Sequence, residues 1–219
     1  MRARKRKNTP ERIRACSEYY IEDPMQYKDD WNNVFGNNNP IRLEIGCGKG
    51  DFVKGMAENN PDVNFIAVEK ATDIIVLALE KINNAKLNNV RFINCDAELL
   101  PEYFNREMFD TIYINFCDPW PKKRHAKRRL TSPYFLELFK KILTSDGSIH
   151  FKTDNRPLFD YSLETFPESG YRLENVTFDL HTEELPYDNV KTEYERNFIA
   201  KGFKINRLEA FIDKKEEQL

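Results

Sequence analysis

Short apolar runs alternate with longer amphipathic stretches through most of the chain. Runs of about four to eight apolar, often β-branched residues are typical of buried strands, whereas apolar positions three or four residues apart mark one face of a helix. Residues 109–114 follow the first pattern, and Ile75, Leu79 and Ile82 follow the second. The strands predicted in this way cover residues 41–45, 64–69, 90–95, 109–114, 147–152, 171–179 and 197 to about 206. The predicted helices cover residues 10–22, 49–59, 72–86, a short stretch near 97, 132–143 and 156–168.

Strands that alternate with helices predict an α/β fold with a parallel sheet covered on both faces. In such a fold, ligands bind beyond the carboxyl ends of the strands. Residues 40–219 are expected to form this domain, and residues 1–39 a basic arm and a short helix. The arm carries Arg2, Arg4, Lys5, Arg6 and Lys7. Two interpretations of the arm stay open, a solubilising tail and a segment that becomes ordered on RNA.

Composition excludes several classes of protein. The 219 residues are enough for one large α/β domain, and 32% of them are charged. The longest uncharged apolar run, residues 74–79, is too short to cross a bilayer, and no apolar segment follows the basic N-terminus as in a secretory signal. The cysteines at positions 16, 47, 95 and 117 have no close pairing and no histidine at zinc-ligand spacing. This predicts free thiols, a reducing cytoplasm and no structural metal.

Residues 43–50, Leu-Glu-Ile-Gly-Cys-Gly-Lys-Gly, join the first predicted strand to a helix. The glycines at 46, 48 and 50 allow a tight turn and a close approach of the backbone to a ligand. A dinucleotide site would favour G-x-G-x-x-G and a helix N-terminus that faces a pyrophosphate. Glu44, at the end of the strand, would repel a pyrophosphate but would pair with an ammonium. S-Adenosylmethionine carries an ammonium and no phosphate, so the sequence favours it over a dinucleotide.

Two further acids end the next two predicted strands. Glu69 can accept hydrogen bonds from ribose hydroxyls, as acids do in sites for both NAD and S-adenosylmethionine. The alternative for Glu69 is an ordinary exposed acid. Asp96 can accept a hydrogen bond from an adenine amino group or can cap the short helix that begins at Ala97, and the two roles can coexist.

The fourth predicted strand runs into the corner Asp118-Pro119-Trp120-Pro121. The two prolines end any regular element and stiffen the chain. Six Lys or Arg follow between positions 122 and 129. A carboxylate and an indole beside a cationic loop suit an RNA that presents one base to a pocket, although a Pro-rich turn next to a solvated charge run is the alternative. The formal net charge of −2 does not by itself indicate RNA binding, but screening within about 10 Å lets a local basic patch act alone.

Together these motifs resemble the bacterial tRNA (guanine-N7-)-methyltransferases, which are class I, Rossmann-like methyltransferases. The resemblance runs from about residue 43 to 203 and rests on the acids at 44, 69 and 96, on Asp-Pro-Trp-Pro-Lys-Lys-Arg-His at 118–125, on Lys-Thr-Asp-Asn at 152–155 and on Thr-Glu-Tyr-Glu-Arg at 192–196. It implies a seven-stranded, mostly parallel sheet with helices on both faces and an antiparallel last strand. It also implies methyl transfer from S-adenosylmethionine to N7 of a guanine in the tRNA variable loop. Neither a membrane nor an obligatory protein partner is expected.

The resemblance also implies a role for individual residues. The cofactor-binding positions would be Glu44, Gly46, Gly48, Gly50, Glu69, Asp96, Ala97 and Asp118. The guanosine side would consist of Lys122, Asp154, Thr192, Glu193, Tyr194 and Glu195, and the RNA-contacting loop of Arg124, His125, Ala126, Lys127, Arg128 and Arg129. Asp118 would be the catalytic residue. For residues 192–195 the alternative is a helix start capped by Thr192, with Glu195 at the third position.

The chemistry of guanine limits what the protein must supply. Because N7 has a free lone pair at neutral pH, no nucleophilic Cys or Ser with a positioned base is expected. Asp118 is expected to bind the N1–H and amino group of the base, or to offset its developing charge. Trp120 can stack on the base or pack beneath the loop. The alternatives are an adenine amino-methyltransferase, whose Asp-Pro-Pro-aromatic motif Trp120 would interrupt, a non-catalytic RNA-binding module, and an NAD oxidoreductase, which Glu44 disfavours.

Overall fold

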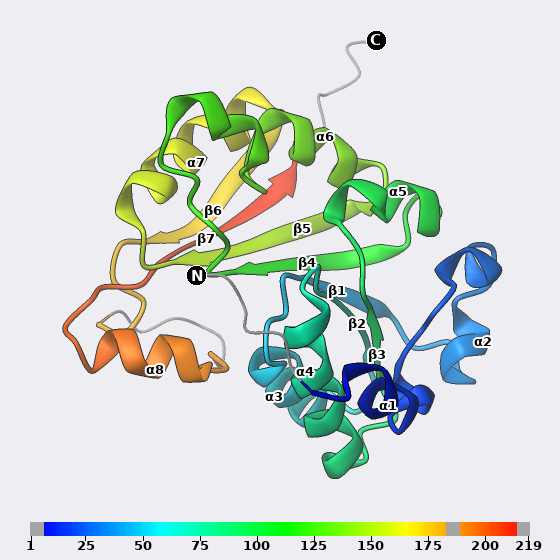
Figure 1. Cartoon of the computed structure of the whole chain (residues 1–219). Helices are drawn as coiled ribbons and strands as arrows, with labels where there is room; N and C mark the ends of the chain where they lie inside the picture. The colour runs from blue at the N-terminus through cyan, green and yellow to red at the C-terminus, as the bar shows by residue number, and fades with distance from the viewer. Residues whose placement is uncertain (1–6, 183–188, 214–219) are drawn as a thin grey trace, which may run out of the picture. The chain divides into compact units, whose positions relative to one another are not determined.

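The computed structural model describes residues 7–182 and 189–213 (Figure 1). Residues 2–6 of the basic arm lie outside the described residues. The chain forms two compact units, which are described separately: the first unit is Met1–Asn105 with Asn189–Glu193, and the second unit is Arg106–Asp188 with Tyr194–Leu219. None of the described helices combines the length and the apolar content needed to cross a membrane.

The predicted sheet is confirmed, with seven strands in the order β3-β2-β1-β4-β5-β7-β6. The strands are β1 (Ile41–Ile45), β2 (Asn64–Val68), β3 (Val90–Ile93), β4 (Phe109–Asn115), β5 (Leu143–Thr153), β6 (Tyr171–Thr177) and β7 (Asn206–Ile212). β1 pairs with β2, β2 with β3, and β4 with β5, all in parallel. β7 runs antiparallel to both β5 and β6. The sheet is therefore mostly parallel with an antiparallel last strand, as expected.

In the first unit, helices pack around β1, β2 and β3. They are α1 (Thr9–Arg14), α2 (Asn32–Phe35), α3 (Asp51–Asn59), α4 (Thr72–Ala85) and α5 (Leu100–Tyr103), with 3-10 turns η1 (Ser17–Tyr19), η2 (Pro24–Tyr27) and η3 (Ala97–Leu99). The stripe of Ile75, Leu79 and Ile82 on α4 is fully buried, as its spacing predicts. Every residue of β2 is buried too, which agrees with the apolar run that follows Asn64 in this strand.

In the second unit, α6 (Pro133–Lys140) and α7 (Arg156–Glu168) cover β5, and α7 also packs on β6 and β7. The unit also contains η4 (Lys123–Arg128) and all but the first residue of α8 (Glu193–Ile199). α7 begins where it does because the Asn155 side chain accepts a hydrogen bond from the N–H of Leu158 at 2.9 Å. Phe151, Phe159 and Phe166 form a fully buried aromatic core.

Two predicted elements differ most from the structure. The strand predicted over residues 197–206 is wrong, because α8 occupies its beginning and the strand β7 covers Asn206–Ile212. β7 is difficult to recognise in the sequence because it contains Arg207 and Glu209, and charged residues are usually exposed. In the structure both side chains are buried and paired with each other. The single helix predicted over residues 10–22 is interrupted, with α1 ending at Arg14 and η1 beginning at Ser17.

Candidate functional site

The glycine-rich turn lies between β1 and α3 in the first unit. Gly46, Gly48 and Gly50 have φ angles of 78°, 55° and 76°, in the left-handed region where a side chain is unfavourable. Gly50 is also tightly packed, since a Cβ there would lie 2.8 Å from the Cβ of Ala78. A larger residue at position 50 would strain the turn and push α3 away from α4.

The backbone N–H groups of this turn are used inside the protein. Gly46 and Cys47 both donate to the carbonyl oxygen of Val68, at 2.8 and 3.0 Å, and Gly48 donates to the Glu69 carboxylate at 3.1 Å. A dinucleotide site would instead present such N–H groups to a pyrophosphate. The turn is therefore poorly suited to phosphate and fits a ligand that carries none.

Glu44 and Glu69 place negative charge beside this turn. Glu44 lies in β1 and is only 3% exposed. Glu69 follows β2, and besides the bond to Gly48 its carboxylate accepts a hydrogen bond from the N–H of Ala71 at 2.8 Å. Fixed carboxylates of this kind bind ammonium and hydroxyl donors, and both groups occur in S-adenosylmethionine. The carboxylate acceptors of the first unit thus fit that cofactor.

Asp96 follows β3 and begins η3 at Ala97. Its side chain pairs with Lys70 and accepts a hydrogen bond from the N–H of Glu98 at 3.3 Å, so the predicted capping role is confirmed. Burial by itself would raise the pKa of Asp96, but the hydrogen bonds from Lys70 and from the helix N–H groups lower it below its ordinary value. Asp96 is therefore ionised at neutral pH and can accept hydrogen bonds.

The cysteines near these motifs are not nucleophiles at neutral pH. Burial, followed by the charges of Glu44 and Glu69, raises the pKa of Cys47 well above its usual range. Burial and then the charge of Asp118 raise the pKa of Cys117 to about 12. Because the thiolate is the reactive form, both side chains are inert in the ordinary pH range. All four cysteines of the chain are free thiols.

Asp118 lies on a strained corner of the second unit. Phe116 and Trp120, on either side of it, have φ angles of 53° and 42°. Non-glycine residues adopt this region at a cost of roughly 1–3 kcal/mol each, and such strain is concentrated at functional sites. Asp118 itself is exposed. The corner therefore presents an accessible carboxylate on a backbone that its surroundings hold in place.

Arg129 is the residue that holds the corner. Its guanidinium donates to the carbonyl oxygens of Pro119 and Trp120, both at 3.1 Å, and lies 4.3 Å from the ring centre of Tyr161. The family resemblance implies an RNA-contacting role for Arg129 and does not reveal this role within the protein. The one feature of the sequence that could have suggested this role is that Arg129 follows the Pro-rich corner at residues 118–121.

Trp120 packs against the basic loop, as one of its two predicted roles required. Its ring lies 5.7 Å from the His125 ring in an edge-on arrangement, and the Arg128 guanidinium lies 5.0 Å from its ring centre. The indole is half-buried by these contacts. The loop and the corner beside Asp118 are thus linked through one aromatic side chain.

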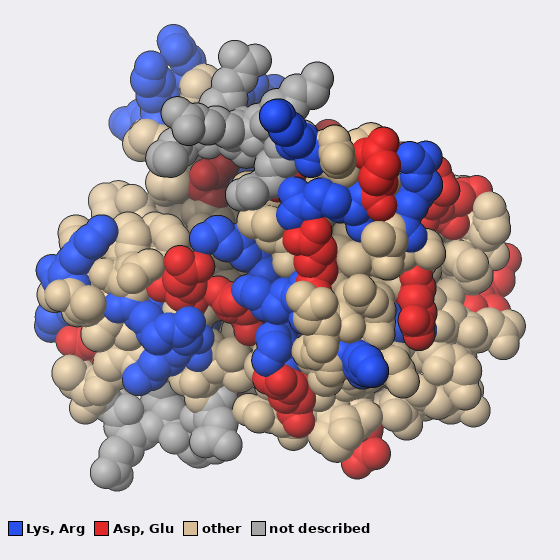
Figure 2. All heavy atoms as spheres, turned by 60° about the horizontal axis from the view of Figure 1, so that its bottom comes forward, with Lys and Arg blue, Asp and Glu red and all other residues tan. Residues whose placement is uncertain are grey.

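The remaining cations of the loop face solvent. Exposed Lys or Arg side chains occur at positions 122, 123, 124, 127 and 128, whereas His125 and Ala126 are half-buried. On the face drawn in Figure 2, Lys and Arg side chains are interspersed with Asp and Glu and do not form one uniform basic surface. On this face, binding of a polyanion would therefore depend on short local clusters of cations.

Two residues assigned to the guanosine side meet in the second unit. The Tyr194 hydroxyl donates to the Asp154 carboxylate at 3.3 Å. The Tyr194 ring stacks on Phe198 with centres 4.3 Å apart and lies 4.9 Å from the Phe116 ring. Burial and then Asp154 raise the pKa of Tyr194 to about 12, so the phenol stays protonated and remains a donor. Lys122, by contrast, is exposed.

Glu195 is fully buried and contacts Lys152, the first residue of the 152–155 motif, and His181, which the sequence did not single out. Lys152 on β5 donates to its carboxylate at 2.9 Å, and His181 lies 3.1 Å from its other oxygen. The side chain of Lys152 is only 4% exposed. Buried ion pairs fix geometry strongly, because losing one partner leaves an uncompensated charge. Thr192 and Glu193 precede this residue in the chain and belong to the first unit.

Comparisons with known proteins show which family this chain resembles in sequence. A family model described as "Putative methyltransferase" matches residues 38–208. A "tRNA (guanine-N(7)-)-methyltransferase" of Listeria innocua is 48% identical over 214 residues, which cover 98% of this chain and 100% of that protein. The protein of the same name from Bacillus velezensis is 50% identical, covering 86% of this chain and 87% of that one.

Solved structures with the same fold are more distant in sequence. The 16S rRNA methyltransferase KamB has a TM-score of 0.65 with 16% identity, covering 85% of this chain and 95% of its own. A SAM-dependent methyltransferase from Aquifex aeolicus has a TM-score of 0.55 with 14% identity, covering 94% of this chain and 100% of its own. At these identities the likeness concerns the fold alone.

Proposed function

Because this chain belongs to the family of tRNA (guanine-N(7)-)-methyltransferases, we propose that it transfers a methyl group from S-adenosylmethionine to N7 of a guanine in tRNA. The observation that carries the proposal is the 48% identity over 98% of the chain. The glycine turn supports it, because its N–H groups are used internally and leave none of these donors for a pyrophosphate. We place the methylated guanine in the variable loop and the enzyme in the cytoplasm, with no obligatory protein partner.

The residues proposed to hold the cofactor are the acids and glycines of the strand ends. Glu44 and the turn at Gly46, Gly48 and Gly50 would receive its amino-acid part, Glu69 its ribose, and Asp96 with Ala97 its adenine. When bound, S-adenosylmethionine supplies a methyl group on a positively charged sulfur. Asp118 is proposed to lie on this side as well.

The protein's part in the reaction is to orient the base. Guanine N7 attacks with a lone pair that needs no deprotonation, so the protonated thiols of Cys47 and Cys117 are no obstacle. Asp118 is proposed to accept hydrogen bonds from the guanine N1–H and amino group. Its negative charge would also stabilise the positive charge that develops on the base. Orientation of this kind can lower a barrier by up to about 7–11 kcal/mol.

The other substrate contacts follow from charge and exposure. Lys122 is proposed to bind phosphate or the O6 edge of the guanine, and Asp154 with Tyr194 to contact the nucleoside. Exposed cations from Arg124 to Arg128 are proposed to bind tRNA phosphates. This assignment gives the loop a role in affinity and the corner at Asp118 a role in turnover.

The decisive test is analysis of nucleosides after incubation of unmodified tRNA with labelled S-adenosylmethionine. We expect N7-methylguanosine from the wild type, whereas N6-methyladenosine would favour the alternative adenine amino-methyltransferase. Asp118→Asn keeps the size of the side chain but removes its charge, and we expect it to lose at least 100-fold in kcat while retaining cofactor affinity. Full activity of this variant would overturn the role of Asp118.

A further inference from the structure

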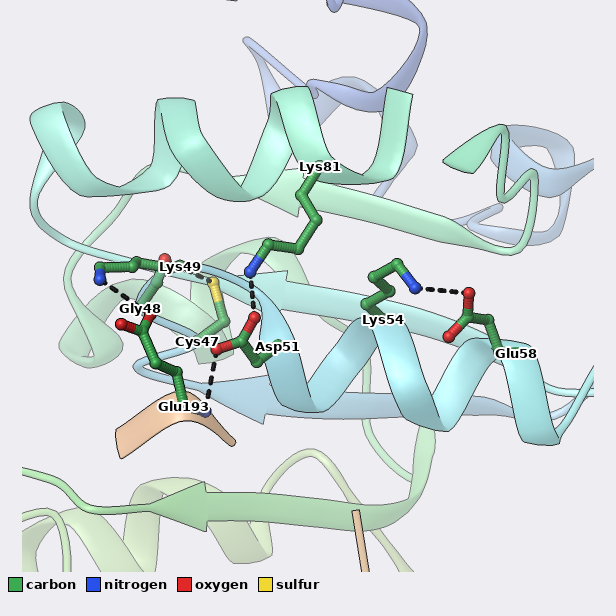
Figure 3. Close-up of polar contacts among 8 residues, drawn as sticks. All are labelled: Cys47, Gly48, Lys49, Asp51, Lys54, Glu58, Lys81 and Glu193. Carbon is green, nitrogen blue, oxygen red and sulfur yellow. Dashed lines mark hydrogen bonds and ion pairs between the residues drawn. The ribbon is translucent and has the colours of Figure 1, made fainter. Parts of the chain in front are cut away.

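The segment 189–193 is docked on α3, the helix that follows the glycine turn, and Figure 3 shows the contacts of Glu193 with Lys49 and Asp51. The N–H of Glu193 donates to the Asp51 carboxylate at 3.1 Å, and the Glu193 side chain pairs with Lys49 at 3.0 Å. Val190 packs on Gly55, where a Cβ would come within 2.6 Å of a Val190 methyl group. Two hydrogen bonds between residues 142 and 144 positions apart thus join the segment to the region of the glycine turn.

These contacts differ in strength. The Lys49 and Glu193 side chains are 51% and 53% exposed, so this ion pair contributes little to docking. Asp51 is only 23% exposed, and Lys81 of α4 binds its other oxygen and fixes its orientation. Val190 is stiff at χ1 and cannot easily turn away from Gly55. Asp51 and the absence of a side chain at position 55 therefore contribute more to the docking than the exposed ion pair does.

The docked segment connects the residues proposed to bind the cofactor with those proposed to bind the guanosine. Asp51 directly follows Gly50 of the cofactor turn, and Glu193 directly precedes Tyr194 of the guanosine side. A ligand that immobilises the turn also immobilises Asp51. Less conformational entropy is then lost when a second ligand binds beside residues 193–195.

We propose that Asp51 and Gly55 are positioning residues that hold residues 189–193 on α3 and thereby make cofactor and tRNA binding cooperative. This inference rests on the proposed function, because it assumes that the two ligands are S-adenosylmethionine and tRNA. Coupling between two sites is reciprocal, and its usual size corresponds to roughly a 5- to 150-fold change in affinity. We expect S-adenosylhomocysteine to tighten tRNA binding by about tenfold in the wild type.

Two variants are expected to weaken the contact of residues 189–193 with α3, each by removing a different interaction. Asp51→Ala removes the acceptor for the Glu193 N–H. Gly55→Ala leaves every charge in place and favours the helix, but its Cβ displaces Val190. The matched control is Lys54→Ala, which breaks an ion pair with Glu58 on the same helix at 2.5 Å, shown in Figure 3.

The measurement is tRNA affinity with and without saturating S-adenosylhomocysteine, together with amide hydrogen exchange of the ligand-free proteins. We expect Asp51→Ala and Gly55→Ala to reduce the coupling to within about twofold of none and to speed exchange of the Glu193 amide, while Lys54→Ala changes neither. Unchanged coupling in both variants would overturn the inference, as would a wild type that methylates tRNA without any coupling. A wild type that makes no N7-methylguanosine would instead reject the proposed function.

Discussion

Replacing Arg129 separates its role within the protein from a role in RNA binding. Arg129→Gln removes the planar guanidinium that bridges the carbonyl oxygens of Pro119 and Trp120 and stacks over Tyr161. Arg129→Lys keeps the charge, but a single ammonium cannot reproduce the two-pronged geometry. If the side chain serves the corner, both changes should weaken the corner. If it serves phosphate, only the loss of charge should matter.

The expected magnitude follows from these contacts. A hydrogen bond from a charged donor contributes about 1.5–3 kcal/mol, and a cation–π contact about 0.5–1 kcal/mol. Arg129 is half-buried, so the lower ends of these ranges apply. Relaxation of the left-handed backbone at Trp120 would offset about 1 kcal/mol of the loss. We therefore expect Arg129→Gln to lower the free energy of unfolding by about 2 kcal/mol, and Arg129→Lys by about half as much.

Urea unfolding and tRNA binding at several salt concentrations test this reasoning. For Arg129→Gln we expect the loss of stability, a fall in kcat of about tenfold because Asp118 is no longer held, and an unchanged dependence of log affinity on log salt concentration. Lys127→Gln is the matched control, since Lys127 is exposed on the same loop, and it should leave stability unchanged. A role of Arg129 in holding the corner would be refuted if Arg129→Gln kept full stability and flattened the salt dependence as much as Lys127→Gln.

The remaining predictions concern the loop and the buried ion pair. Reversing the charges of Lys127 and Arg128 should weaken tRNA binding and flatten its salt dependence by roughly 0.7–0.9 per lost phosphate contact; an unchanged slope would place this loop outside the RNA interface. Glu195→Gln should lower the free energy of unfolding by about 3–5 kcal/mol, because it leaves the charge of Lys152 buried without its carboxylate. Adding Lys152→Met should restore most of that loss in urea unfolding, and a further loss would contradict the ion-pair argument.

The parallel core was predictable because local sequence determines it. Strands such as β2 and β4 are almost entirely buried, and a strand buried on both faces must be apolar at nearly every position. The antiparallel strand β7 was misplaced for the opposite reason. Arg207 and Glu209 are buried there as an ion pair, Asn175 donates a hydrogen bond to Glu209 at 2.7 Å, and His150 on the neighbouring strand lies 3.8 Å from Glu209. Periodicity cannot reveal a buried charge whose partner makes burial possible.

The residues of the candidate site also fall into two groups, those that could be predicted from the sequence and those that could not. The glycine turn and the acids after each strand could be read from the sequence, because their roles depend on backbone conformation and on the sign of the charge nearby. Which cations bind a ligand could not be read, because it depends on what else each cation touches. Arg129 and Lys127 are two positions apart and equally basic, but only Arg129 has carbonyl oxygens of the corner within reach. A motif thus identifies the chemistry of a loop, and the contacts of each side chain decide which charges remain for the substrate.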